Sequence, residues 1–86
     1  MHIGELTKLE ETARAIKITE QGDKLDGRND RPIYLPKSQI QVRKEPDGRM
    51  MIYVPDWLIE KNRINWNRIT EIKPWKELHN GYFTSN

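Results

Sequence analysis

Short strand-like runs that end at prolines dominate the middle of this chain, residues 33–58. Ile33-Tyr34-Leu35 is followed by Pro36, and the run over residues 50–54 is followed by Pro55. Proline lacks a backbone N–H, so it interrupts a hydrogen-bonded ladder and is tolerated mainly at strand ends and sheet edges. The pattern predicts short antiparallel strands, the first of them at a sheet edge or interrupted there.

The segment between these two runs predicts a hairpin. Ile40 and Val42 alternate with polar residues, and the loop that follows reads Glu45-Pro46-Asp47-Gly48-Arg49. Proline presets φ for a type I turn, and glycine accepts the left-handed conformation that comes after it. In the return strand, residues 50–54, apolar side chains again alternate. We therefore expect both arms to pack one face on a common core, with Met50 and Met51 serving strand packing.

The first third of the chain predicts one more strand and a polar loop. Ile16 and Ile18 alternate with polar neighbours, which favours a strand over residues 12–19. Upstream, residues 3–9 form either an extended segment feeding this strand, which we favour, or a short helical turn. Residues 20–30 hold two glycines and almost nothing apolar, so we expect a loop with a mobile tip.

A helix is expected after the hairpin. Proline suits the first turn of a helix, which predicts a helix from Pro55 to about Asn62. Trp57 and Leu58 are adjacent in it, and we expect Trp57 to anchor the core.

Two interpretations stay open for the segment that follows this helix. Either Asn67 caps a second short helix that ends at Pro74, or residues 69–73 form a final strand. The sequence alone does not separate the two.

Size and composition limit the fold further. The chain has 86 residues, no cysteine and a formal net charge of +2. We expect one domain over residues 1–78 and a polar C-terminal tail over residues 79–86. The expected fold is mainly β with one short helix (α+β), a small antiparallel curled sheet or barrel of roughly four or five strands. No apolar run approaches the about 18 residues of a membrane span and no signal peptide is evident, so we expect a cytoplasmic protein without membrane contact.

Catalytic and metal-binding patterns are missing from the sequence. Its histidines are His2 and His79, one near each end. Ser38 follows a proline and suits a turn better than a nucleophile, because no elbow motif surrounds it. The aspartates of residues 23–30 lack the glycine and glutamate positions of a calcium loop. We therefore expect no enzymatic activity, no metal and no cofactor.

Basic residues mingle with aromatic residues along the predicted strands. Small β-barrels bind single-stranded nucleic acid through a cationic groove and aromatic rings that stack on bases. A simpler alternative is that these charges form the polar face of a half-buried sheet whose core edge the tyrosines cover. The candidate nucleic-acid-binding residues are Arg31, Tyr34, Lys37, Arg43, Lys44, Arg49 and Tyr53.

Aromatic residues near the C-terminus suggest a different partner. An exposed apolar patch there would suit a protein partner, whereas the same residues could form a packed terminal lid. The candidate protein-binding residues are Trp66, Trp75, Tyr82 and Phe83.

Four stretches of sequence, in this order along the chain, resemble a group of small uncharacterised proteins of bacteriophages and prophages. They are Glu10-Glu11-Thr12, Ala15-Ile16, Tyr34-Leu35-Pro36-Lys37-Ser38-Gln39-Ile40 and Val54-Pro55-Asp56-Trp57-Leu58. The resemblance covers about residues 10–64 and implies an accessory product of phage replication and recombination regions, acting in the cytoplasm of a bacterial host. We therefore expect a non-enzymatic protein that binds nucleic acid, favouring single strands. The alternative is a module that inhibits a host enzyme or defence system, and the oligomeric state stays open.

Overall fold

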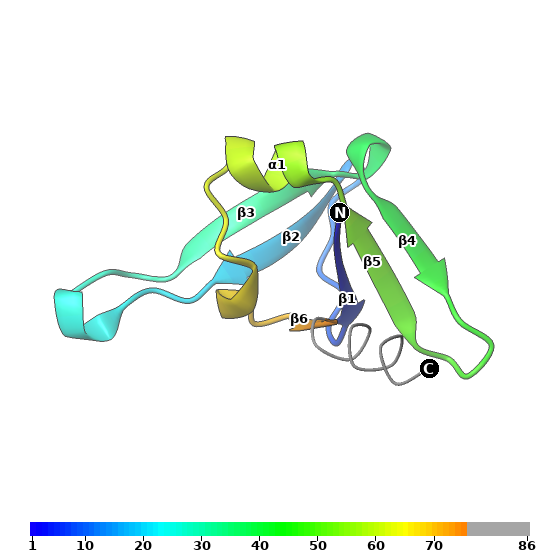
Figure 1. The fold of residues 1–86 in the computed structure, drawn as a ribbon, viewed down its shortest axis with the longest axis horizontal. Coiled ribbons are helices and arrows are strands. Elements are labelled where there is room, and N and C mark those ends of the chain that lie inside the picture. Colours follow the sequence, from blue (N-terminus) through cyan, green and yellow to red (C-terminus); the bar gives the residue numbers. More distant parts are fainter. Residues whose placement is uncertain (76–86) are drawn as a thin grey trace, which may run out of the picture.

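A computed structural model describes residues 1–75 of the chain (Figure 1). The described part contains six strands, one α-helix and three short 3-10 turns. The strands are β1 (His2–Leu6), β2 (Ala15–Glu20), β3 (Arg31–Pro36), β4 (Gln41–Lys44), β5 (Met50–Val54) and β6 (Ile72–Pro74). The helix is α1 (Asp56–Lys61), and the 3-10 turns are η1 (Lys24–Asp26), η2 (Lys37–Gln39) and η3 (Trp66–Arg68).

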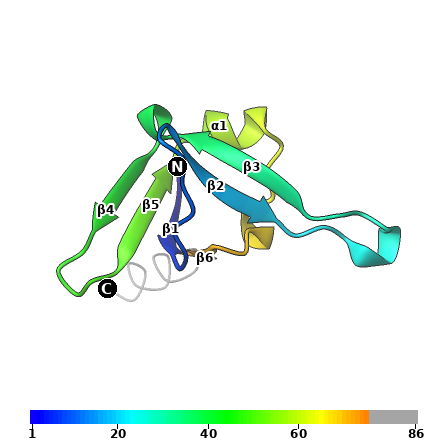
Figure 2. The same ribbon diagram turned by 180° about the vertical axis from the view of Figure 1, so that it is seen from behind.

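The strands form two antiparallel sheets. Four strands pair in the order β4-β5-β1-β6, and β2 pairs with β3 in a separate two-stranded ribbon. Figures 1 and 2 show this ribbon running away from the four-stranded sheet, with α1 above the space between them. The expectation of a mainly β, antiparallel fold with one short helix is confirmed. The strands number six rather than four or five, and they form two sheets instead of one curled sheet or a closed barrel.

The central hairpin forms as its turn sequence predicts. Val42 lies opposite Ile52 in the β4–β5 register. The Glu45 N–H donates to the Arg49 carbonyl at 2.7 Å, and Gly48 has a φ of 94°, in the left-handed region. Proline and glycine thus close the loop in the conformations that each favours.

The N-terminal segment forms a strand, so the favoured extended interpretation is confirmed. β1 pairs with β5 on one side and β6 on the other, which makes it an inner strand of the four-stranded sheet. By contrast, β3 pairs only with β2 within the described chain, so Pro32 and Pro36 lie on a strand with a free edge. This agrees with the edge position predicted from its prolines.

The core fills the space between the two sheets and α1. Along β2 and β3 every second side chain faces inward, as Ile16, Ile18, Ile33 and Leu35 show. Each strand contributes one face, as alternation in sequence predicts. The buried cluster consists of Leu6, Ile16, Ile18, Ile33, Leu35, Ile52, Val54, Leu58, Ile59, Ile64, Trp66, Ile69 and Ile72.

Helix α1 lies where Pro55 predicts it, but Trp57 is not in the core. Its side chain is 49% exposed, whereas Leu58 and Ile59 are buried. Successive side chains on a helix are about 100° apart. Because Leu58 and Ile59 occupy the inward side of this six-residue helix, Trp57 faces outward, and the predicted anchoring role is wrong.

The segment after α1 matches neither of the two predicted alternatives completely. Asn65, not Asn67, caps a single 3-10 turn, its side chain accepting from the Asn67 N–H at 3.2 Å. The strand then begins at Ile72 and not at Ile69. The predicted boundary at residues 78–79 and the tail of residues 79–86 lie outside the described residues.

A buried carboxylate connects the two sheets. The Glu71 side chain accepts from the Thr19 N–H at 2.7 Å, and the Glu71 carbonyl accepts from the Thr7 N–H at 2.7 Å. The Thr70 N–H also donates to the Thr19 carbonyl at 3.0 Å. Residues 70–71 therefore hold the ribbon and the four-stranded sheet together through hydrogen bonds.

Candidate nucleic-acid interface

The four-stranded sheet has one face on the core and one face turned away from it. Strand pairing places Tyr53 beside Gln41 and Ile3, and Met51 beside Arg43 and Glu5. Because Ile52 and Val54 face the core, these side chains belong to the opposite side of the sheet. We call this side the outer face; it carries Ile3, Glu5, Gln41, Arg43, Arg49, Met51, Tyr53, Lys73 and Trp75.

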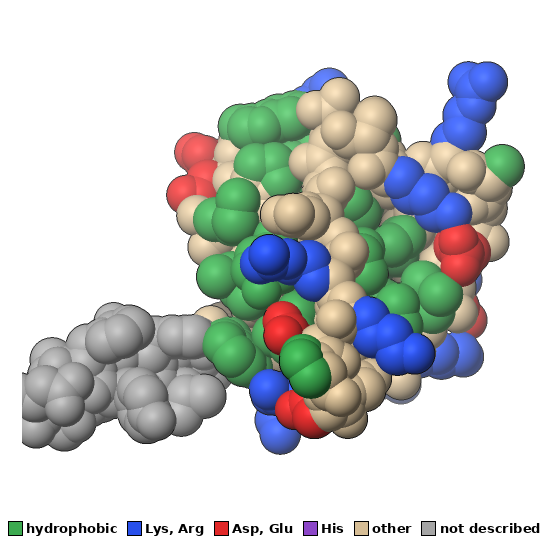
Figure 3. All heavy atoms as spheres, turned by 90° about the vertical axis from the view of Figure 1, so that its right-hand side faces the viewer, with side chains coloured by type: hydrophobic (Ala, Val, Ile, Leu, Met, Phe, Trp, Pro, Cys, Tyr) green, Lys and Arg blue, Asp and Glu red, His purple; other side chains and the backbone are tan. Residues whose placement is uncertain are grey.

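Two arginines lie over two aromatic rings on the outer face. The Arg43 guanidinium is 5.8 Å from the centre of the Tyr53 ring, and the Arg49 guanidinium is 5.7 Å from that of Trp75. Both distances are within the range of a cation–π interaction. Figure 3, which looks at the side of the molecule that bears β4 and the hairpin loop, shows basic side chains interspersed with hydrophobic ones.

The Trp75 ring extends along the outer face. The Trp75 backbone N–H donates at 3.0 Å to the carbonyl of Ile3, on β1. The Trp75 ring nevertheless contacts Arg49, at the hairpin loop between β4 and β5. Met51, which lies between these points, is only 1% exposed. The accessible rings of this face are therefore those of Tyr53 and Trp75, both half-buried.

The hairpin loop holds Arg49 in place. The Asp47 side chain accepts from the Arg49 backbone N–H at 3.0 Å and from the Arg49 Nε at 2.8 Å. These hydrogen bonds, the backbone one first, lower the pKa of Asp47 below its ordinary value. The carboxylate is thus charged at neutral pH and orients the guanidinium toward Trp75.

The seven predicted nucleic-acid-binding residues do not form one site. The structure brings Arg43, Arg49 and Tyr53 together on the outer face. Lys44 alternates with Arg43 along β4 and is exposed at the opposite side of the strand. Arg31, Tyr34 and Lys37 belong to the ribbon and the turn after it.

Each of these three ribbon residues is placed differently. Arg31 pairs with Glu20 and donates to two backbone carbonyls, so its donors are used within the protein. Lys37 forms an ion pair with Glu11. Tyr34 is 54% exposed and lies opposite Lys17 on the outer side of the ribbon. Arg31 and Tyr34 thus lie on β3 and Lys37 on η2, whereas Arg43 lies on β4 of the other sheet.

The aromatic residues predicted for a protein partner are also separated. Trp66 is buried against the core and meets His2 edge-on at 5.6 Å, so it cannot form an exposed patch. Trp75 lies on the outer face, next to the candidate nucleic-acid residues. Tyr82 and Phe83 lie outside the described residues.

Surface hollows also occur within residues 1–75, and two of them bear on the candidate sites. One, of about 330 Å³, is largely apolar and lies beside β4, lined by Leu9, Glu11, Ile16, Lys37, Ile40, Val42 and Met50. The other is polar, lies at the loop end of the ribbon and is lined by four arginines. Its arginines come from separate segments, so sequence spacing had not grouped them.

The described residues contain no group of three or more His, Asp or Glu side chains placed to hold a metal ion. None of the helices in residues 1–75 has the length and apolar character needed to cross a membrane. Comparison with known proteins finds no family model, no curated protein and no solved structure that matches the chain.

Proposed function

We propose that this protein binds single-stranded nucleic acid on the outer face of its four-stranded sheet. The observation that carries the proposal is the pair of arginine–aromatic contacts, Arg43 on Tyr53 and Arg49 on Trp75. Single strands are bound by rings that stack on bases and by cations that follow the backbone. The outer face carries both kinds of group within one sheet.

The charge on this face supports an anionic partner. Arg43, Arg49 and Lys73 face outward, against the two carboxylates of Glu5, on β1, and Asp47, which pairs with Arg49. A local excess of positive charge attracts a polyphosphate chain even when the whole protein is close to neutral. The modest total charge of +2 thus fits a small, local interface.

The geometry suggests which groups of the outer face would contact the bases and which would contact the phosphates. Bases would stack on Tyr53 and Trp75, which have flat π faces and are selective for no particular base. The arginines next to these rings would reach the phosphates on either side, since a guanidinium both stacks and donates in a fork. This division predicts weak sequence preference and a strong dependence of affinity on salt.

The biological setting is part of the same proposal. The resemblance of residues 10–64 to small phage and prophage proteins supports an accessory role in phage nucleic-acid metabolism, in the cytoplasm of a bacterial host. The role proposed is non-enzymatic: the protein covers or holds a strand and leaves its bonds intact.

Fluorescence anisotropy with a labelled single-stranded oligonucleotide tests the proposal. Affinity should fall as salt rises, and Tyr53→Ala should weaken binding about 5- to 150-fold, the effect of about 1–3 kcal/mol for one lost stacking contact. Tyr34→Ala is the matched control, because Tyr34 is an exposed tyrosine on the other sheet. It should bind like the unmodified protein.

Three outcomes would contradict the proposal. They are no binding at low salt, binding that does not change with salt, and equal losses for the Tyr53 and Tyr34 variants. A duplex of the same sequence serves as a competitor, and it should compete less well than the single strand.

A further inference from the structure

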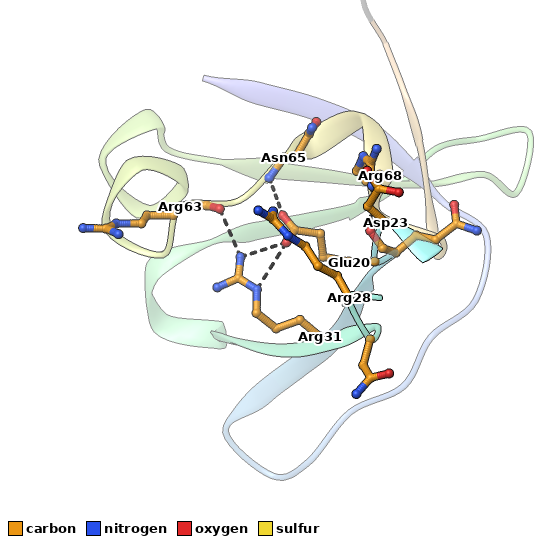
Figure 4. A pocket seen from close by; sticks show the side chains of 10 residues that line it. Glu20, Asp23, Arg28, Arg31, Arg63, Asn65 and Arg68 are labelled. Atoms are coloured by element: carbon orange, nitrogen blue, oxygen red, sulfur yellow. Dashed lines mark hydrogen bonds and ion pairs between the residues drawn. The ribbon is translucent and has the colours of Figure 1, made fainter. Parts of the chain in front are cut away.

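The polar hollow at the loop end of the ribbon is built from four arginines. It has a volume of about 680 Å³ and lies between the β2–β3 loop and the segment that joins α1 to η3 (Figure 4). This size is within the range of small-molecule sites. We call it the arginine pocket; its lining residues include Arg28, Arg31, Arg63, Arg68, Glu20 and Asp23.

The Arg31 side chain is held in one position at the arginine pocket by its contacts within the protein. Its Nε and Nη2 lie 3.2 and 3.1 Å from Glu20 Oε1, and Nη1 and Nη2 each donate at 3.0 Å to a carbonyl, of Asn62 and Arg63. Glu20 and Arg31 are opposite each other at the end of the ribbon, on its core-facing side. The pair therefore joins the ribbon to the chain after α1, and its geometry is set before any ligand arrives.

The two carboxylates of the pocket are already engaged. The second oxygen of Glu20 accepts from the Asn65 N–H. Asp23 accepts from the Leu25 N–H at 3.0 Å, and this bond, helped by the charge of Arg68, lowers its pKa. Glu20 is therefore engaged by Arg31 and the Asn65 N–H, whereas Asp23 also attracts Arg68 through its charge.

The Arg28 backbone N–H donates to the Asp23 carbonyl at 2.8 Å, whereas its side chain has no hydrogen-bond or ion-pair partner within residues 1–75. Figure 4 shows its side chain running toward Glu20 and Arg31, whereas the Arg63 side chain points away from them. Arg68 makes one contact of 3.4 Å, from Nη1 to the Gln21 carbonyl, so its other donors stay available. With Arg63 pointing away, the three other guanidinium groups against two carboxylates leave a formal excess of one positive charge around the hollow.

Gly22 brings the Arg28 segment against the pocket. A Cβ at position 22 would lie 2.4 Å from both the Arg28 and the Asn29 carbonyl oxygens. The Gly22 N–H also donates to the Asp30 side chain at 3.0 Å, which holds the loop folded back on itself. Only glycine permits this approach, so the position of Arg28 depends on the absence of a side chain here.

We propose that the arginine pocket binds a phosphate group, held by Arg28 and Arg68 against the fixed guanidinium of Arg31. Guanidinium forks match the oxygens of phosphate, and Arg28 and Arg68 supply two such forks from two segments. Arg31, whose donors are used within the protein, contributes its positive charge. The group could belong to free phosphate or to the phosphorylated end of a nucleic-acid strand. The chemistry is shared, and the site is separate from the outer face.

Isothermal titration at constant ionic strength tests the pocket with two probes. One is inorganic phosphate, and the other is a pair of dinucleotides with a 5′-phosphate or a 5′-hydroxyl end. Binding of either phosphate probe, with the 5′-hydroxyl dinucleotide weaker, supports the proposal. Phosphate alone identifies a free anion, and the phosphorylated dinucleotide alone identifies a strand end.

Matched variants assign the binding to the pocket. Arg28→Ala and Arg68→Ala should each weaken phosphate binding about 10- to 100-fold, the effect of losing one charged hydrogen-bonding contact. Arg14→Ala is the control: Arg14 is exposed, precedes the opposite end of β2 and should leave binding unchanged. Gly22→Ala should also weaken binding, since it displaces Arg28.

The proposal is overturned if neither phosphate probe binds, or if the Arg28 and Arg14 variants bind alike. Tyr53→Ala separates this result from the proposed function, since that variant should lose oligonucleotide affinity and keep phosphate affinity. Circular dichroism of each variant shows that it is folded.

Discussion

The outer face and the arginine pocket use the same residue type in opposite ways. On the outer face, Arg43 and Arg49 lie over aromatic rings. In the pocket, Arg31 donates to a carboxylate and to backbone carbonyls. Rings prepare a surface for bases, whereas a guanidinium held by fixed oxygens prepares a surface for an anion. The contacts of an arginine, more than its presence in the sequence, indicate what it can bind.

We expect the largest effect on stability in the hydrophobic core, on which both the outer face and the arginine pocket depend. Leu35 is fully buried on β3, and Leu35→Ala should lower the free energy of unfolding by about 2–5 kcal/mol because it removes packing and leaves a cavity. Urea denaturation measures this change. Tyr34→Ala, at the next residue but facing outward, should change stability by less than about 0.5 kcal/mol. Similar losses for the two variants would contradict the sidedness of the ribbon.

The next effect sharpens the contrast between a structural and a surface carboxylate. Glu20→Ala should lower the free energy of unfolding by roughly 1–2 kcal/mol, because Arg31 and the Asn65 N–H both lose their acceptor. Its control, Glu5→Ala, removes a carboxylate from the outer face and should be nearly neutral. Thermal melting of both variants measures this difference in stability. An equal loss of stability would show that Glu5 also stabilises the fold, which would contradict the contrast.

A smaller effect tests whether the outer face depends on stacking or on charge alone. Arg43→Lys keeps the charge but weakens the contact with Tyr53, so affinity for a single strand should fall about 2- to 5-fold, for a loss of about 0.5–1 kcal/mol. The dependence of affinity on salt should stay the same. Arg43→Ala should in addition reduce the salt slope by about 0.7. If the lysine variant binds like the unmodified protein, charge alone suffices.

The smallest effect concerns the hairpin loop that holds Arg49. The pKa of Asp47 is lowered in the folded protein, so its contribution to stability is present above about pH 4 and is lost as pH falls through the lowered pKa. Asp47→Asn removes this dependence. The difference in melting temperature between the two proteins should therefore shrink on acidification below about pH 4. A difference that stays constant would show that Asp47 does not act through its charge.

Local sequence signals predicted the local parts of this fold. The loop at Pro46 and Gly48, the alternation of Ile16 with Ile18 and the helix after Pro55 all form as expected. Each of these is decided by neighbouring residues, through turn geometry, strand alternation or a helix start. The elements were therefore accessible from sequence, within a few residues at their ends.

Pairing between distant segments was not accessible in the same way. β1 lies between β5 and β6, which follow it by about fifty and seventy residues, and no local pattern marks that pairing. The division into two sheets separated Arg31 and Tyr34 from Arg43 and Tyr53. The same long-range contacts assembled the arginine pocket from Arg28, Arg31 and Arg68, which no motif connects.

The hydrogen bonds made by residues 70–71 have a consequence for how the chain acquires its structure during synthesis. Thr7, which directly follows β1, and Thr19, on β2, both form hydrogen bonds with this late segment. The ribbon and the central hairpin can each form as they leave the ribosome, since their contacts are local. The ribbon and the four-stranded sheet can take their final relative orientation only after residues 70–71 have left the ribosome, because these residues form the hydrogen bonds that join them. A ribosome-stalled nascent chain that ends before residue 70 would expose the apolar inner surfaces of both sheets. A chaperone would therefore bind most strongly to the chain at this stage of synthesis.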